Sequence, residues 1–200
     1  MRDPSRPVQV VWFKRDLRLH DHAPLAAAAR RGPVLCVYVV EPEVLHAPVH
    51  DPSHLVFVNE CLQDLDRQLR ARGCPLIVLH GDLPGVFDAL HRALGGFEAL
   101  WSHEEVGIGI TFARDRRVAA WCRDHGVRWT EIPQHGVFRG LRDRDGWAAR
   151  WRARMNQPVT AALERLEATE IPSDGPAPIG IRAPEDLGLP ASERTDAQRG

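Results

Sequence analysis

The stretch from Val10 to Leu25 constrains the fold more than any other part of the 200-residue sequence. It opens with four consecutive apolar residues that end at Phe13, and such a run is typical of a strand covered on both faces of a sheet. A charged loop follows, and Asp21 and Pro24 are then placed to cap and begin a helix. The stretch predicts the first unit of an open α/β sheet, in which ligands bind at the carboxyl ends of the strands.

The first two-thirds of the chain continue this alternation of short apolar runs and amphipathic segments. The pattern predicts strands over residues 9–13, 34–40, 76–80, 99–102 and 127–132. It predicts helices over residues 22–31, 54–72, 83–94 and 111–125. Because parallel strands need a crossover connection, this alternation predicts an α/β fold: an open five-stranded parallel Rossmann-like sheet flanked by helices.

The alternation of strands and helices ends at Ile132, and the remainder of the sequence has a different character. Residues 133–156 are charged and contain tryptophan, and a short helix is expected over residues 159–169, after Pro158. From Ile171 onward prolines recur and large apolar residues are few, as in a linker. We therefore expect an α/β domain over residues 7–133, a helical extension over 134–170 and an interdomain linker over 171–200.

Composition argues against several classes of protein. An apolar content of 44% allows a real core, and a net charge of −1 gives no general attraction to nucleic acid or membranes. The four cysteines form no C-x-x-C pair, so we expect reduced thiols in a cytoplasmic protein, without a zinc site or a disulfide framework. No apolar run approaches membrane-spanning length, and the N-terminus lacks the apolar core of a secretory signal.

Charged residues follow three of the predicted strands at their carboxyl ends, where a ligand cleft is expected. Arginine and lysine there form charge-assisted hydrogen bonds with polar or phosphate groups of a ligand. The candidate lining residues are Phe13, Lys14, Arg15, Asp16, Arg18, Glu41, His103, Glu104 and Glu105. The alternative is that Arg15, Asp16 and Arg18 pair with one another and with neighbouring segments. No G-x-G-x-x-G follows the first strand, so the dinucleotide-binding fingerprint is absent.

The histidines do not form a convincing metal-binding pattern. Three of them recur at a spacing of four residues: His46, His50 and His54. Pro48 and Pro52 break any helix that would align these side chains. His20 and His22 flank the predicted helix cap. We therefore expect surface histidines and no metal site.

Six arginines crowd between Arg139 and Arg154, together with Trp147 and Trp151 at a spacing of four. Arginines with interleaved aromatic residues can bind the phosphates of a nucleic acid and stack on its bases. Asp143 and Asp145 dilute this charge, and two tryptophans on one helix face more often indicate packing or domain docking. The sequence contains no G-x-S-x-G and no S-x-x-K. On residue chemistry alone, the chain is a binding domain without a catalytic centre.

Three segments of the chain, in order, resemble the photolyase/cryptochrome family. Residues 10–22, VVWFKRDLRLHDH, resemble the family's opening signature V-x-W-F-R-R-D-L-R-x-x-D-N, with Lys14 in place of the first arginine and His22 in place of the asparagine. Residues 65–82, which end in Gly-Asp, resemble the family's second helix and third strand. Residues 112–127 are similar to the R-D-x-x-V helix that precedes the family's fifth strand.

The resemblance, which spans residues 8–170, implies the N-terminal domain of a deoxyribodipyrimidine photolyase, a lyase that uses light to repair UV pyrimidine dimers in DNA. It implies that the first strand is central in the sheet. It also implies that the domain holds an antenna pigment, which is methenyltetrahydrofolate, a deazaflavin or a flavin in different members. Glu104 or Glu105 stands where some members place a carboxylate that faces the pigment.

The same resemblance implies that the helical domain of this flavoprotein family, with its FAD and lesion-binding residues, is missing from the chain. No catalytic residue is therefore assigned, and the chain is expected to be inactive alone. The missing FAD-binding domain would dock on the side that carries Trp147 and Trp151. Two alternatives stay open: a cryptochrome-type light-signalling half, or a stand-alone nucleotide- or pigment-binding module.

Overall fold

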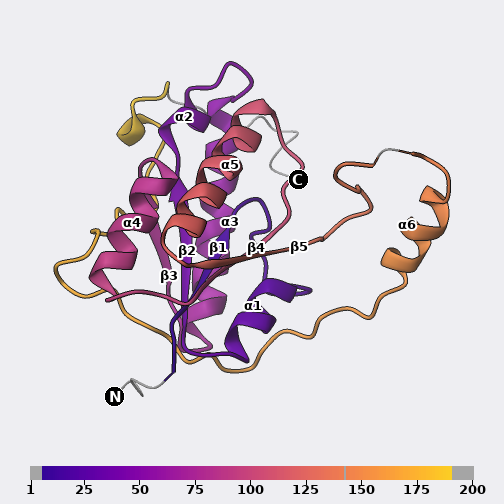
Figure 1. The fold of residues 1–200 in the computed structure, drawn as a ribbon. Helices are drawn as coiled ribbons and strands as arrows, with labels where there is room; N and C mark the ends of the chain where they lie inside the picture. The colour runs from indigo at the N-terminus through magenta and orange to yellow at the C-terminus, as the bar shows by residue number, and fades with distance from the viewer. Residues whose placement is uncertain (1–5, 142, 191–200) are drawn as a thin grey trace.

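The computed structural model describes residues 6–141 and 143–190 and is built around a five-stranded sheet (Figure 1). The strands are β1 (Gln9–Phe13), β2 (Val34–Val40), β3 (Leu76–His80), β4 (Ala99–His103) and β5 (Arg128–Ile132). All neighbouring strands are parallel, and their order is β3-β2-β1-β4-β5. The predicted open parallel sheet with a central first strand is therefore confirmed.

Through the first two-thirds of the chain, four helices follow the predicted segments closely, and one short helix over residues 42–45 was not predicted. The helices are α1 (Ala23–Ala29), α2 (Pro42–Leu45), α3 (Pro52–Arg70), α4 (Leu83–Ala93), α5 (Gly109–Asp124), α6 (Trp147–Met155) and the 3-10 helix η1 (Glu185–Leu187). Proline stands in the first turn of each of the first four, where its fixed backbone angle and missing N–H suit a helix start. Among the described residues, no helix is both long enough and apolar enough to cross a membrane.

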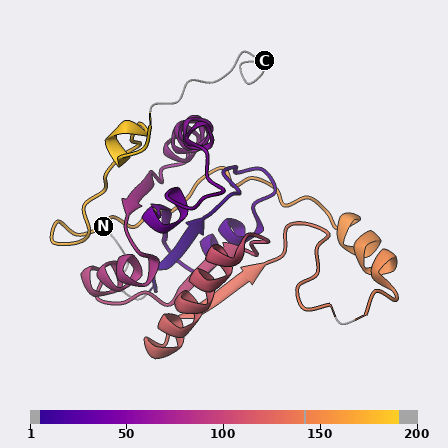
Figure 2. The same cartoon turned by 90° about the horizontal axis from the view of Figure 1, so that it is seen from above.

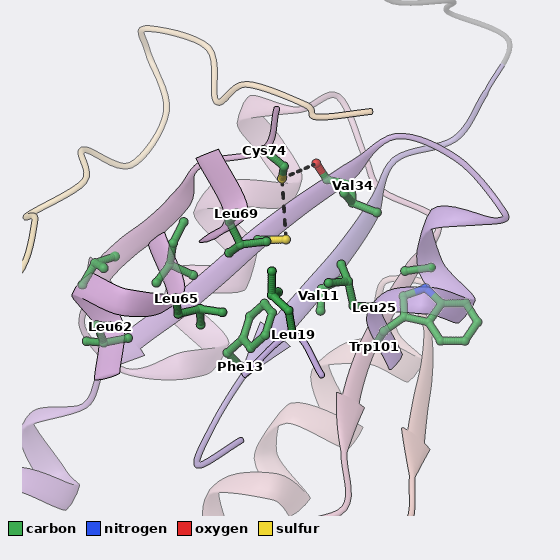
Figure 3. Packing of buried hydrophobic residues seen from close by; sticks show 14 of the residues in the cluster. Val11, Phe13, Leu19, Leu25, Val34, Leu62, Leu65, Leu69, Cys74 and Trp101 are labelled. Carbon is green, nitrogen blue, oxygen red and sulfur yellow. Dashed lines mark hydrogen bonds between the residues drawn. The ribbon is translucent and has the colours of Figure 1, made fainter. Parts of the chain in front are cut away.

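β1 contributes to two hydrophobic cores, one on each face of the sheet, and helices cover both faces (Figure 2). Because side chains alternate along a strand, Val11 and Phe13 pack with α1 and α3 on one face. Val10 and Trp12 pack with α4 and α5 on the other. Figure 3 shows the first core, where Leu65 of α3 lies against the sheet. Burial on both faces explains why the strand is uniformly apolar.

The cap of α1 is His22, so the prediction of Asp21 as the cap is wrong by one residue. His22 Nδ1 accepts a hydrogen bond from the backbone N–H of Leu25 at 3.1 Å. Asp21 has a left-handed backbone conformation (φ 51°), and its carboxylate accepts the N–H of Thr160 at 2.9 Å. This long-range contact takes the Asp21 carboxylate away from the helix. His22 is only 1% exposed, so the expectation of a surface histidine is also wrong there.

After β5 the chain leaves the α/β body as an arm, described over residues 133–141 and 143–159, which carries α6 and then returns to the body (Figure 1). None of the described α6 residues is buried. The helix predicted over residues 159–169 does not form, because the start of β2 binds this segment through its backbone. The N–H of Val34 donates to the carbonyl of Glu167 at 2.7 Å, and the N–H of Thr169 donates to the carbonyl of Val34 at 2.8 Å.

Residues 160–189, called the strap below, run along the body with little regular structure. The N–H of Ile179 donates to the carbonyl of Val78 in β3 at 2.9 Å. Leu166 of the strap belongs to the first core. Six partly buried apolar residues of the strap pack against this core: Leu163, Ala168, Ile179, Ile181, Leu187 and Leu189. A proline-rich sequence typical of a linker thus belongs to a segment that contacts the domain. The predicted domain boundaries stay a prediction.

Candidate ligand-binding site

A cavity of about 640 Å³ opens at the carboxyl ends of β1 and β2. Its walls come from the loop after β1, the end of β2, α2, the first half of α3 and the first turns of α5. Phe13, Tyr38, Leu55 and Val58 contribute apolar surface to its lining. The volume lies within the range of small-molecule sites, roughly 300–1,000 Å³. Its position is the one at which open α/β sheets bind ligands.

The fold distributes the nine predicted site residues between two adjoining cavities. The larger cavity is lined by six of them: Phe13, Lys14, Arg15, Arg18, Glu41 and Glu105. A smaller cavity of about 210 Å³ is lined by the other three: Asp16, His103 and Glu104. Lys14, Arg15 and Glu105 line both cavities, so the two spaces share a wall. The contact of each residue with a ligand stays a prediction.

A buried arginine that the sequence analysis did not single out, Arg114, organises one wall of the larger cavity. Its guanidinium donates hydrogen bonds to the carboxylates of Glu41 (2.7 Å) and Asp115 (2.9 Å). It also donates to Glu105 and lies over the Trp12 ring at 4.8 Å. Burial opposes the charge of Arg114, but the surrounding carboxylates hold its pKa above the ordinary value.

Glu41 is a carboxyl group of this wall whose pKa is raised by burial. Burial raises the pKa of Glu41 to about 7, against the opposing effect of the Arg114 guanidinium. Its side chain is 14% exposed, so little water is available to stabilise the carboxylate. The cavity wall therefore changes charge near neutral pH.

Lys14 is engaged in contacts within the protein. Its ammonium lies 3.4 Å from carboxylate oxygens of both Asp115 and Glu131. It also lies over the rings of Trp12 (4.3 Å) and Trp129 (5.2 Å), and the side chain is 3% exposed. Lys14 thus supports the wall of the cavity. Arg15, whose side chain is 68% exposed, is the more accessible cation.

Asp16 is the centre of a buried cluster that joins three elements of the fold. Its carboxylate accepts hydrogen bonds from His103 Nδ1 (2.6 Å) and His22 Nε2 (2.8 Å). It also accepts the backbone N–H of Lys14 at 2.9 Å. Burial alone would raise the pKa of Asp16, but the hydrogen bonds from His103 and His22 hold it far below its ordinary value. This carboxylate ties the loop after β1 to the start of α1 and the end of β4.

The ligand atoms of Asp16, His22 and His103 lie within 4.8 Å of one another, a spacing that a metal ion could bridge. The hydrogen bonds argue against an ion at this place. Because His22 Nδ1 accepts the N–H of Leu25, its Nε2 carries the ring proton and has no lone pair for a metal. Burial lowers the pKa of His22, which keeps the ring neutral. The cluster therefore supports the loop through hydrogen bonds.

Sequence reasoning missed most of the walls that α3 and α5 provide. Thr111 and Arg114 share the buried face of α5 with Val118, and this helical spacing was the available signal. His50, predicted at the surface, lines the cavity, and its buried Nε2 has no hydrogen-bond partner among the described residues. Buried polar atoms are normally satisfied, so a ligand is one source of the missing partner.

The sheet and its strand-end cavity define a doubly wound α/β domain of the kind that binds ligands at the carboxyl ends of its strands. The family model for DNA photolyase matches residues 9–146. The chain therefore belongs to the DNA photolyase family.

Proteins similar to this chain include both photolyases and cryptochromes. The deoxyribodipyrimidine photo-lyase of Halobacterium salinarum is 34% identical over 132 residues, covering 60% of this chain and 24% of that protein. Cryptochrome-2 of Gallus gallus is 30% identical over 130 residues, covering 64% of this chain and 22% of that protein. The chain thus spans about a quarter of the length of these relatives.

Two solved structures share the fold across almost the whole chain. The Synechocystis cryptochrome has a TM-score of 0.71 at 20% identity, covering 96% of this chain and 42% of that one. The archaeal photolyase from Sulfolobus tokodaii has a TM-score of 0.67 at 18% identity, covering 92% of this chain and 42% of that one. That photolyase is described with two FAD molecules and a novel light-harvesting cofactor.

Proposed function

We propose that this chain is the N-terminal antenna domain of a deoxyribodipyrimidine photolyase and that the 640 Å³ cavity holds the antenna pigment. The observation that carries the proposal is a ligand-sized cavity with apolar walls at the strand ends of a photolyase-family domain. The described light-harvesting cofactor of the Sulfolobus tokodaii photolyase supports the assignment of an antenna function.

The residues present fit a flat aromatic pigment with polar edges. The apolar lining, including Phe13 and Tyr38, accommodates a ring system. The Nε2 of His50, which has no hydrogen-bond partner within residues 6–141 and 143–190, is available to a polar atom of the pigment. Arg15 is the exposed cation at the cavity for a charged substituent. A methenyltetrahydrofolate, a deazaflavin and a flavin all have this chemistry.

The proposed partners of this chain are an FAD-binding domain and DNA that contains pyrimidine dimers. The likeness to photolyases supports repair. The likeness to cryptochromes supports the alternative, a light-signalling protein with the same antenna domain. A stand-alone pigment- or nucleotide-binding module is the third candidate, and it requires the same cavity.

Filling the cavity with a larger side chain should prevent pigment binding. Val44 lies on α2 and lines the cavity, so Val44→Trp places an indole in the space proposed for the pigment. We expect the affinity for the pigment that binds wild type to fall by about tenfold or more. FMN, a deazaflavin and methenyltetrahydrofolate are titrated separately, and fluorescence and absorbance report binding.

Val49→Trp is the matched control, because Val49 lies nearby, is 65% exposed and does not line the cavity. This control is expected to bind as wild type does. Circular dichroism of both variants checks that the fold is retained. Failure of all three pigments to bind wild-type protein would contradict the proposed function, and equal binding by Val44→Trp would contradict the assigned cavity.

The arm should promote self-association of the isolated chain. Trp147 and Trp151 are 43% and 40% exposed on α6, and exposed apolar area favours weak association. We expect concentration-dependent dimers that Trp151→Arg reduces, because arginine removes apolar area and adds repulsive charge. Sedimentation across a concentration series measures this. Val49→Arg is the control and should associate as wild type does. A strictly monomeric wild type would show that the exposed tryptophans of α6 do not mediate self-association.

A further inference from the structure

Two thiols lie in contact inside the core, although 38 positions separate them in the sequence (Figure 3). Cys36 is in β2, and Cys74 is in the turn between α3 and β3. Their sulfur atoms are 3.6 Å apart, and the two residues are 0% and 1% exposed. The other cysteines have different surroundings: Cys61 borders the ligand cavity, and Cys122 belongs to the core on the opposite face of the sheet.

The geometry of the pair suits a reaction between the two sulfur atoms. A disulfide has a bond of about 2.05 Å, so the sulfur atoms must approach by roughly 1.5 Å. Side-chain rotation and a small shift of the turn can supply this approach, because Cys74 lies outside both α3 and β3. The hydrogen bond between the thiols lowers the pKa of Cys74 although burial opposes ionisation. Cys74 is therefore the better nucleophile of the two.

We propose that Cys36 and Cys74 are a redox modification site, at which a small peroxide converts the two thiols into a reversible disulfide. The sulfur of Cys74 attacks one peroxide oxygen, the O–O bond breaks, and the products are a sulfenic acid and, after proton uptake, water. The sulfur of Cys36 then attacks the sulfenic sulfur and displaces its oxygen, which leaves as a second water with the thiol proton. Two thiols are oxidised and one peroxide is reduced.

The crosslink would join the two backbone stretches that hold the strap. Val34, two residues before Cys36, pairs with Glu167 and Thr169 of the strap. Arg72, two residues before Cys74, accepts the N–H of Leu166 at its carbonyl oxygen, at 2.9 Å. The modification site therefore lies where β2, the turn after α3 and the strap meet. A peroxide reaches it when the turn or the strap opens locally.

The test is oxidation of the folded 200-residue chain by hydrogen peroxide. After the peroxide is removed, the free thiols are alkylated in denaturant and counted by mass spectrometry. We expect the number of alkylated thiols to fall from four to two, with a crosslinked peptide pair that contains Cys36 and Cys74. Treatment with dithiothreitol should restore all four thiols.

Matched variants identify the sulfur atoms that react. The double variant Cys61→Ala/Cys122→Ala keeps only the proposed pair and should lose both remaining thiols on oxidation. Cys74→Ala should retain all three of its thiols at the same peroxide dose. Cys36→Ala should form no disulfide and can lose only the Cys74 thiol, as a sulfenic acid. Circular dichroism of both variants checks that the fold is retained. Four intact thiols in oxidised wild type, or a crosslink through Cys61 or Cys122, would overturn the proposal.

Discussion

Replacing Asp16 with alanine is expected to lower the free energy of unfolding by about 3–5 kcal/mol, enough to unfold a large fraction of a marginally stable domain. The substitution leaves three buried donors without their acceptor: the ring N–H groups of His22 and His103 and the backbone N–H of Lys14. Each unsatisfied buried donor costs roughly 1–3 kcal/mol. Urea denaturation followed by tryptophan fluorescence measures the change.

Asp124→Ala is the matched control, because Asp124 is exposed at the end of α5, and we expect a change within about 0.5 kcal/mol. Because the pKa of Asp16 is low in the folded protein, its contribution to the free energy of unfolding depends on pH. Its contribution to stability is present above the unfolded pKa of 3.8 and is lost as the pH falls toward the lower folded value. A loss below about 1 kcal/mol in Asp16→Ala would show that the buried cluster is not held as described.

The second large effect is a pH-dependent difference between wild type and Glu41→Gln. The pKa of Glu41 is 4.5 when unfolded and about 7 when folded, so the folded state binds the proton more tightly. Wild type should therefore lose stability relative to Glu41→Gln as the pH rises from below 4.5 to above 7. The full change corresponds to about 3 kcal/mol.

Denaturation of both proteins between about pH 4 and about pH 8.5 tests this linkage. Because the difference between the two proteins is followed across pH, any pH-independent effect of the amide on packing cancels from the trend. Glu43→Gln is the control, since Glu43 is half exposed on α2, the helix that Glu41 immediately precedes, and a much smaller trend is expected. A pH-independent difference, or one of opposite sign, would mean that burial does not raise the pKa of Glu41.

Local sequence patterns were sufficient to predict the sheet, because the apolar run of β1 and the amphipathic pattern of residues 83–94 depend on neighbouring residues. Local patterns gave wrong predictions where a segment forms hydrogen bonds with residues far away in the sequence. Residues 163–168 consist of good helix formers, yet they stay extended because Val34 binds their backbone. Asp21 satisfied the rule for a helix cap, but Thr160 binds its carboxylate.

For the site as well, the sequence indicated which residues follow a strand but not which distant residues pair with them. Glu41 and Glu105, which the strand-end rule selects, line one cavity. The ion pair between Arg114 and Glu41 joins residues that are 73 positions apart, and the contact between Asp16 and His103 joins residues 87 apart. Such pairings depend on how helices and strands pack in three dimensions, which the spacing of residues along one element does not specify.

Because β1 contributes side chains to both cores, it should tolerate substitutions far better than insertions or deletions. Val11 and Val10 serve cores on opposite faces, so a substitution between apolar residues disturbs one core at a time. A single-residue insertion or deletion within the strand would send every following side chain to the wrong face. The arm has no such constraint, because the described residues of α6 are not buried. Lineages of this domain should therefore differ in length at the arm and keep the length of the central strand.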